Sequence, residues 1–178
     1  RGQGIRLGNL GSAYAELGDA GRAIGYQEQA LAIAREIGDR EGEANSLNNL
    51  GLAYMNLGDA GRAIDYYEQS LGIQRVIGDR HGEGISLGNL GIAYKNLGDA
   101  RRAIGCHEQA LVIREEIGDR MGVATDSFNM ALLYAQLGQV APALPFARQA
   151  AQIWAQIGHT QYAQRAQELV RLIRDSLG

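Results

Sequence analysis

The chain has 178 residues, a formal net charge of −3 and a hydrophobic fraction of 46%, which is ordinary for a water-soluble fold. The small negative charge gives no support to binding of nucleic acid or of an anionic membrane surface. No apolar run approaches the roughly 18 residues of a membrane-spanning helix, and the single cysteine, Cys106, cannot form an internal disulfide, so we expect a cytoplasmic protein in a reducing compartment.

Gly-Asp pairs divide the chain at intervals of 20 residues. They are Gly18-Asp19, Gly38-Asp39, Gly58-Asp59, Gly78-Asp79, Gly98-Asp99 and Gly118-Asp119. Glycine accepts the left-handed conformation just past a helix end, and aspartate caps the next helix by accepting hydrogen bonds from backbone N–H groups of its first turn. The spacing therefore predicts helices of about 17–18 residues, about 27 Å long, joined by tight turns into antiparallel pairs.

The predicted elements are four helix pairs and a last helix. We expect pairs at about 1–38, 39–78, 79–118 and 119–158, and a capping helix within 159–178. The first six helices are predicted at roughly 3–17, 20–37, 40–57, 60–77, 80–97 and 100–117, and the last at roughly 161–176. The fourth pair departs from the repeat, because Gln139 replaces the capping aspartate and two prolines follow it, in a first turn that tolerates them. Thr160 is predicted to cap the last helix.

Apolar residues at helical spacing predict one buried stripe on each helix. In the second pair the stripes are Leu47, Leu50, Ala53, Tyr54 and Leu57, then Ala63, Ile64, Tyr67, Ser70, Leu71 and Ile77. Glycine inside a helix costs about 1 kcal/mol relative to alanine, so its recurrence at Gly11, Gly51 and Gly91 predicts a close approach of two helices. The last helix is expected to cover the end of the array with Tyr162, Ala166, Leu169, Val170, Leu172 and Ile173, with Trp154 packed beneath it.

The residues Leu10-Gly11, Tyr14, Gly18, Ala23 and Ala30-Leu31 resemble the tetratricopeptide-repeat pattern, which returns in the second and third repeats. The 40-residue version is similar to the LGN/Pins polarity adaptors, the kinesin light chains and the tetratricopeptide tails of bacterial STAND (NB-ARC-type) regulatory ATPases. The resemblance implies an all-α, right-handed α-α superhelix. It also implies a protein–protein interaction scaffold that binds a partner peptide or helix in its concave groove, without catalysis or a cofactor.

An asparagine recurs once per repeat, as Asn9, Asn49, Asn89 and Asn129. In the family this position lines the concave groove, and an asparagine amide can both donate to and accept from the backbone of a bound peptide. The alternative is that each amide bonds to a neighbouring repeat and only sets the superhelical geometry. The resemblance implies partner binding by Asn9, Asn45, Asn49, Leu52, Asn56, Asn89, Ile92, Lys95, Asn96 and Asn129.

Other recurrent or reactive residues favour structural roles. We call the four recurrent asparagines the asparagine ladder. Nine residues before three of them lie Arg40, Arg80 and Arg120. This spacing puts each arginine on the opposite side of the helix from its asparagine, so we expect the arginines to pair with carboxylates. Cys106-His107-Glu108 occupies the place of Tyr66-Tyr67-Glu68 without a second ligand at metal-binding spacing. No nucleophile–base pair can be nominated, so an enzyme is not expected.

Two functional readings stay open at this point. The first is the partner-binding scaffold, for which an acidic ligand is not favoured, because only Arg6 matches the basic position of the LGN-like adaptors. The second is a structural or sensor segment of a larger bacterial regulatory ATPase with no separate peptide ligand. The chain enters the repeat part-way, so we expect a fragment of a longer array that can self-associate through its truncated N-terminal end.

Overall fold

The computed structural model describes residues 2–176, and this part of the chain is helical with short turns and no strand. The helices are α1 (Gly2–Glu16), α2 (Ala20–Glu36), α3 (Arg40–Asn56), α4 (Ala60–Ile77), α5 (Arg80–Asn96), α6 (Ala100–Glu116), α7 (Arg120–Gln136), α8 (Val140–Gln156) and α9 (Thr160–Asp175). Every predicted helix is present, with its ends within two residues of the expected positions.

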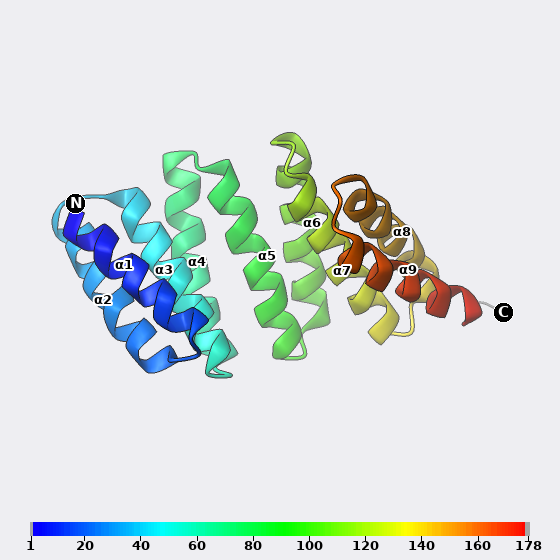
Figure 1. Ribbon diagram of the computed structural model, residues 1–178, viewed down its shortest axis with the longest axis horizontal. Helices are drawn as coiled ribbons and strands as arrows, with labels where there is room; N and C mark the ends of the chain where they lie inside the picture. The colour runs from blue at the N-terminus through cyan, green and yellow to red at the C-terminus, as the bar shows by residue number, and fades with distance from the viewer. Residues whose placement is uncertain (1, 177–178) are drawn as a thin grey trace.

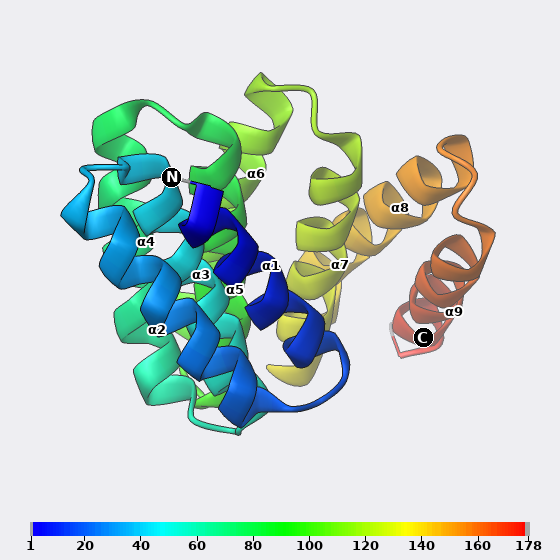
Figure 2. The same cartoon turned by 60° about the vertical axis from the view of Figure 1, so that its left-hand side comes forward.

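The helices form a single row of antiparallel pairs, running from the N-terminal to the C-terminal end of the molecule (Figure 1). Each helix packs against the next along the chain, and α1, α3, α5 and α7 also contact one another in succession. Because these first helices of the pairs approach more closely than the second helices, they form the inner face of the curved array, with α2 and α4 outside (Figure 2).

The turns between helices follow the predicted chemistry. All eight glycines at these turns have φ between 69° and 82°, and each of the six Gly-Asp aspartates accepts a hydrogen bond from the backbone N–H three residues ahead. Gln139 and His159 stand at the same place without a side-chain capping bond. The predicted capping role of Thr160 is wrong, because the turn at Gly158 makes His159 the N-cap and Thr160 the first helical residue.

The predicted core residues are buried except at the helix ends. Leu47, Leu50 and Tyr67 are at most 1% exposed. Leu57 and Ile77 were expected in the same stripes but are 56% and 40% exposed. Leu57 follows the last residue of α3 and Ile77 is the last residue of α4, so the chain has already turned away from the facing helix.

The recurrent glycines of the first helices lie directly beneath large side chains of the second helices. A Cβ atom at Gly51 would come within 2.4 Å of Tyr67 Cε1, and one at Gly91 within 2.5 Å of His107 Nε2. The predicted close approach is therefore confirmed, and glycine is the only residue that fits. The fourth repeat has alanine at both equivalent positions, Ala131 and Ala147, which are fully buried in one cluster.

Ion pairs connect the second helix of one repeat to the first helix of the next. Glu83, whose side chain is 8% exposed, is held by Arg75 Nε at 2.8 Å and Arg80 Nη1 at 2.6 Å. Burial of Glu83 opposes its ionisation, but these two guanidinium groups prevail and hold the pKa of Glu83 below its usual value. Arg40 pairs with Glu43 in the same way. The expectation fails for Arg120, which donates to the amide oxygen of Gln156 rather than to a carboxylate.

The third junction has a different polar network, which includes the histidine of the Cys-His-Glu run. His107 is fully buried and its Nδ1 lies 2.8 Å from Asp126 Oδ1. Arg114 Nε lies 2.7 Å from Asp126 Oδ2. His107 thus joins α6 to α7 inside the array, as the structural interpretation predicts.

The last helix packs against α8. Trp154 is 3% exposed, and its ring centroid lies 5.3 Å from that of Tyr162, which confirms the predicted packing of Trp154. Ala166 and Ile173 are buried. Tyr162 and Leu172 were expected to cover the array end but are 46% and 56% exposed, because the buried face of α9 is centred on its small residues.

Replacing the buried leucines Leu50 and Leu90 by alanine should lower the free energy of unfolding by about 2–5 kcal/mol each. The exposed Leu57→Ala is the matched control and should change it by less than about 0.5 kcal/mol. Urea denaturation followed by circular dichroism measures all three. Losses below about 1 kcal/mol for both buried sites would show that the assigned core is wrong.

Deleting residues 159–178 should expose the apolar end of the array and promote self-association, because repeat arrays need a polar terminal element for solubility. Sedimentation velocity measures the association, and tryptophan emission should shift to the red as Trp154 loses its cover. A truncated chain that stays monomeric and equally stable would contradict a capping role for α9.

Glu83→Gln should lower the free energy of unfolding at pH 7 by about 1–2 kcal/mol, since it removes two charge-assisted hydrogen bonds. The folded-state pKa is depressed, so the stabilisation is present above the unfolded value of about 4.3 and is lost as the pH falls through the folded value. Urea denaturation should therefore give converging stabilities below about pH 4. Glu108→Gln, at an exposed site on α6, is the control, and a pH-independent difference would contradict the ion-pair account.

Candidate partner-binding groove

The predicted asparagine ladder lies on the inner helices α1, α3, α5 and α7. Asn9 is exposed, and Asn49, Asn89 and Asn129 are half-buried. Asn89 Nδ2 donates to Asn48 Oδ1 at 3.1 Å, a bond from α5 to α3. Asn89 thus makes the inter-repeat bond that the structural alternative requires, while its half-buried side chain still lies on the inner face.

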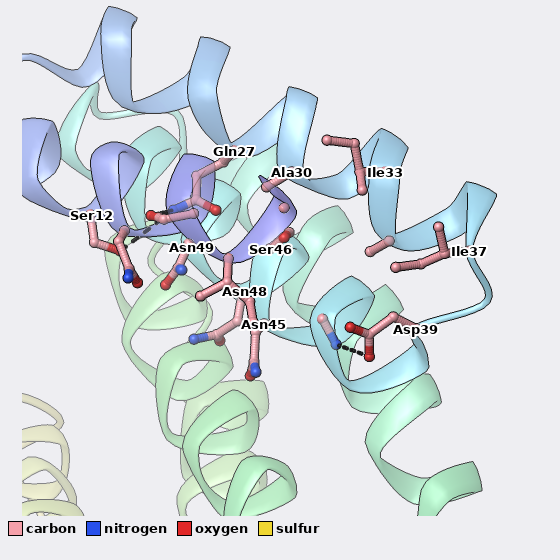
Figure 3. Close-up of a pocket in the computed structure, with 16 residues that line it drawn as sticks. Ser12, Gln27, Ala30, Ile33, Ile37, Asp39, Asn45, Ser46, Asn48 and Asn49 are labelled. Atoms are coloured by element: carbon pink, nitrogen blue, oxygen red, sulfur yellow. Dashed lines mark hydrogen bonds between the residues drawn. The ribbon is translucent and has the colours of Figure 1, made fainter. Parts of the chain in front are cut away.

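A pocket of about 320 Å³ opens between α1, α2 and α3 (Figure 3). Three predicted groove residues, Asn9, Asn45 and Asn49, line it. Sequence reasoning missed Gln27 and Ala34 of α2, which also line the pocket. A comparison of positions 40 residues apart would have indicated Ala34. The equivalent residues in the later repeats are Gln74, Arg114 and Trp154, and Ala34 is the smallest of the four.

A second hollow of about 290 Å³ adjoins the first and shares Asn49 with it. It is lined by the predicted residues Leu52 and Asn56, together with Ser12 and Glu16 of α1. The side chain of Leu52 is 46% exposed. The structure thus gathers the predicted residues of the first two repeats along one face of α3.

The predicted residues of the third and fourth repeats are not among those that line these two hollows, although Asn89 bonds to Asn48, which lines the first. Ile92 is 38% exposed on α5, Lys95 is half-buried and Asn96 is exposed. Asn129 lines a separate hollow of about 480 Å³ with Phe128 and Tyr162. The ten predicted residues therefore follow one helix face without forming one continuous pocket.

The family profile of the tetratricopeptide repeat matches residues 5–75, 43–116 and 82–156. The chain belongs to the tetratricopeptide-repeat family. The repeat geometry described above and the likeness to solved repeat proteins confirm the predicted right-handed α-α superhelix. The sequence matches no curated protein.

Several solved structures share this fold at 20–22% sequence identity. The apo form of RapI superimposes with a TM-score of 0.89 at 20% identity, over 96% of this chain and 62% of RapI. The STAND protein PH0952 of Pyrococcus horikoshii, described as having a tetratricopeptide-repeat sensor, gives 0.85 at 22% identity, over 94% of this chain and 26% of that protein. A putative kinesin light chain of Podosopora anserina gives 0.71 at 22% identity, over 96% and 94%. The chain spans less than two thirds of the first two proteins.

The tetratricopeptide array carries little reactive chemistry in the part that the structure describes. Burial raises the pKa of the Cys106 thiol to about 11, so it is protonated at neutral pH. Among residues 2–176, no three His, Cys, Asp or Glu side chains are placed to hold a metal ion. Across the same residues, none of the helices combines the length and apolar character that crossing a membrane requires.

Proposed function

We propose that this array binds an extended or helical segment of another protein along its inner face and catalyses no reaction. The observation that carries the proposal is the set of asparagine amides on α1 and α3, where Asn9, Asn45 and Asn49 surround a pocket of about 320 Å³. A carboxamide offers two donors and an acceptor, which suits a peptide backbone whose side chains need not be read. The residues that line the pocket are neutral apart from Asp39, so binding there rests mainly on neutral groups.

A solved neighbour supports peptide binding by this fold. A Rap protein complexed with Competence and Sporulation Factor superimposes over 96% of this chain, with a TM-score of 0.68 at 14% identity. That identity supports only the shared architecture, so the ligand of the present array is inferred from its own inner face.

A second candidate is a sensor segment of a larger regulatory ATPase. It is favoured by the likeness to the tetratricopeptide-repeat sensor of the STAND protein, of which this chain covers 26%. The bond between Asn89 and Asn48 also suits a ladder that sets inter-repeat geometry. This candidate predicts that the inner face binds no separate peptide.

Asn49→Ala and Asn89→Ala should each weaken binding of a partner segment about tenfold or more, while the helical circular-dichroism signal is retained. Each change removes the amide that hydrogen-bonds to the partner's backbone. The partner's buried polar groups then lack a hydrogen bond, which costs about 1–3 kcal/mol. Gln69→Ala, which removes an exposed amide from α4, is the control. The partner is isolated by pull-down with the intact array and titrated calorimetrically.

Affinity should fall only modestly between low and physiological salt, because few charges line the groove. Unchanged affinity in both asparagine variants would exclude the ladder as the ligand site. A steep salt dependence would instead assign the contacts to charged groups such as Arg6 and Lys95. Loss of helical signal in the variants would favour the structural alternative.

A further inference from the structure

The junction between the third and fourth repeats contains an internal arginine. Arg114 of α6 places Nη1 2.5 Å from Asp119 Oδ2 and Nε 2.7 Å from Asp126 Oδ2. Its Nη2 donates to the backbone oxygen of Gly84 at 3.3 Å. A Cβ atom at Gly122 would overlap Arg114 Nη1 at 1.8 Å, so the arginine fills the space between three helices.

A glutamine fills the equivalent space one junction earlier. Gln74 is 2% exposed, and a Cβ atom at Gly82 would lie 2.6 Å from its Nε2. Gly82 precedes Gly122 by one repeat, and Ser86 stands where the third junction has Asp126. Neutral glutamine and serine thus stand where the third junction has arginine and aspartate, and Ser86 donates to Ser70 at 3.3 Å rather than to Gln74.

The first junction has the serine but lacks the glutamine. Ser46 is equivalent to Ser86, whereas Ala34 stands in the place of Gln74. The three atoms nearest to a Cβ at Gly42 all belong to its own capping residue, Asp39. The space that a side chain fills in the other two junctions is here the pocket of about 320 Å³.

The pocket also contains a buried acceptor without a donor. Gln27 is 1% exposed and donates from Nε2 to the Gly8 backbone oxygen at 2.9 Å. Its Oε1 is buried with no hydrogen-bond partner, in the wall of the pocket (Figure 3). An occupant with an N–H group would relieve the cost of this unsatisfied oxygen.

We propose that this pocket binds the carboxamide of a glutamine side chain supplied by the partner segment, an inference that rests on the groove binding proposed above. A carboxamide can donate to Gln27 Oε1 and accept from the neighbouring asparagine amides. A guanidinium is disfavoured, because Ser46 stands where Arg114 has Asp126. Of the residues that line the pocket only Asp39, the equivalent of Asp119, carries a carboxylate, and burying a charge with one of its two partners missing is costly. The partner's glutamine thus takes the place that Gln74 occupies one repeat later.

The test is an NMR titration of the whole chain with Nα-acetyl-glutamine methylamide and with its leucine, glutamate and arginine counterparts. We expect millimolar binding of the glutamine probe, with the largest shifts at Gln27, Ser46 and Asn49, and at least tenfold weaker binding of the others. Ala34→Gln should weaken the glutamine probe at least tenfold, because its side chain fills the pocket as Gln74 does. Ala32→Gln, on an exposed face of α2, is the control.

Equal binding of the leucine probe, tighter binding of the arginine probe, or no binding of the glutamine probe would each overturn the proposal. So would an unchanged affinity in Ala34→Gln, and Ala34→Met repeats this test if the glutamine variant loses helical signal. A partner segment that needs Asn49 but tolerates Ala34→Gln would refute the glutamine pocket alone. Ala34-dependent binding of the glutamine probe, combined with a partner affinity that Asn49→Ala and Asn89→Ala leave unchanged, would refute the groove function alone.

Discussion

The turn between helices is the constraint on which the whole array depends. A left-handed glycine ends one helix and the next residue caps the following one, so the chain reverses within two or three residues. Such a short turn permits few conformations. It therefore fixes where each helix begins and ends, and how each helix is rotated relative to the one before. Positions 40 residues apart therefore occupy equivalent places in the array, and each of Gly42, Gly82 and Gly122 lies against the capping aspartate that precedes it.

Within this fixed frame, the side chains at equivalent positions set the character of each junction. Gln27, Tyr67 and His107 stand above a glycine, and the fourth repeat combines two alanines instead. A glycine on the first helix is matched by a large side chain on the second, and an alanine by an alanine. The distance between the two helices is therefore kept while the polarity of the interior changes. Polar interior groups can thus vary from repeat to repeat without disturbing the superhelix.

The sequence predicted the helices, the caps and the repeat register, because these depend on local chemistry that recurs. The sequence did not predict features that depend on contacts between residues far apart in the chain. Leu57 continues the apolar spacing of α3 but lies beyond the last turn that α4 can cover. The buried network of His107, Asp126 and Arg114 joins residues that lie up to 19 positions apart, and no single motif indicates it.

The candidate site was predicted only in outline for the same reason. A family position placed the asparagines on the inner helices. A bond to a neighbouring repeat was the alternative to ligand binding, but Asn48 was not predicted as the partner of Asn89. The pocket itself follows from the short side chain of Ala34, and a small residue in one repeat gives no pattern by itself. It becomes visible only when Ala34 is compared with Gln74 and Arg114.

The series Ala34, Gln74, Arg114 has a mechanical consequence. Arg114 ties together α5, α6 and α7 through Gly84, Asp119 and Asp126, whereas Ala34 can tie nothing. The first junction is held instead by the packing of Leu31 on Ala44 and Leu47 and by the ion pair of Arg35 with Glu43. Pulling the last two repeats apart must therefore break a buried charged network, whereas pulling the first two apart separates apolar surfaces and a pair whose arginine already faces water.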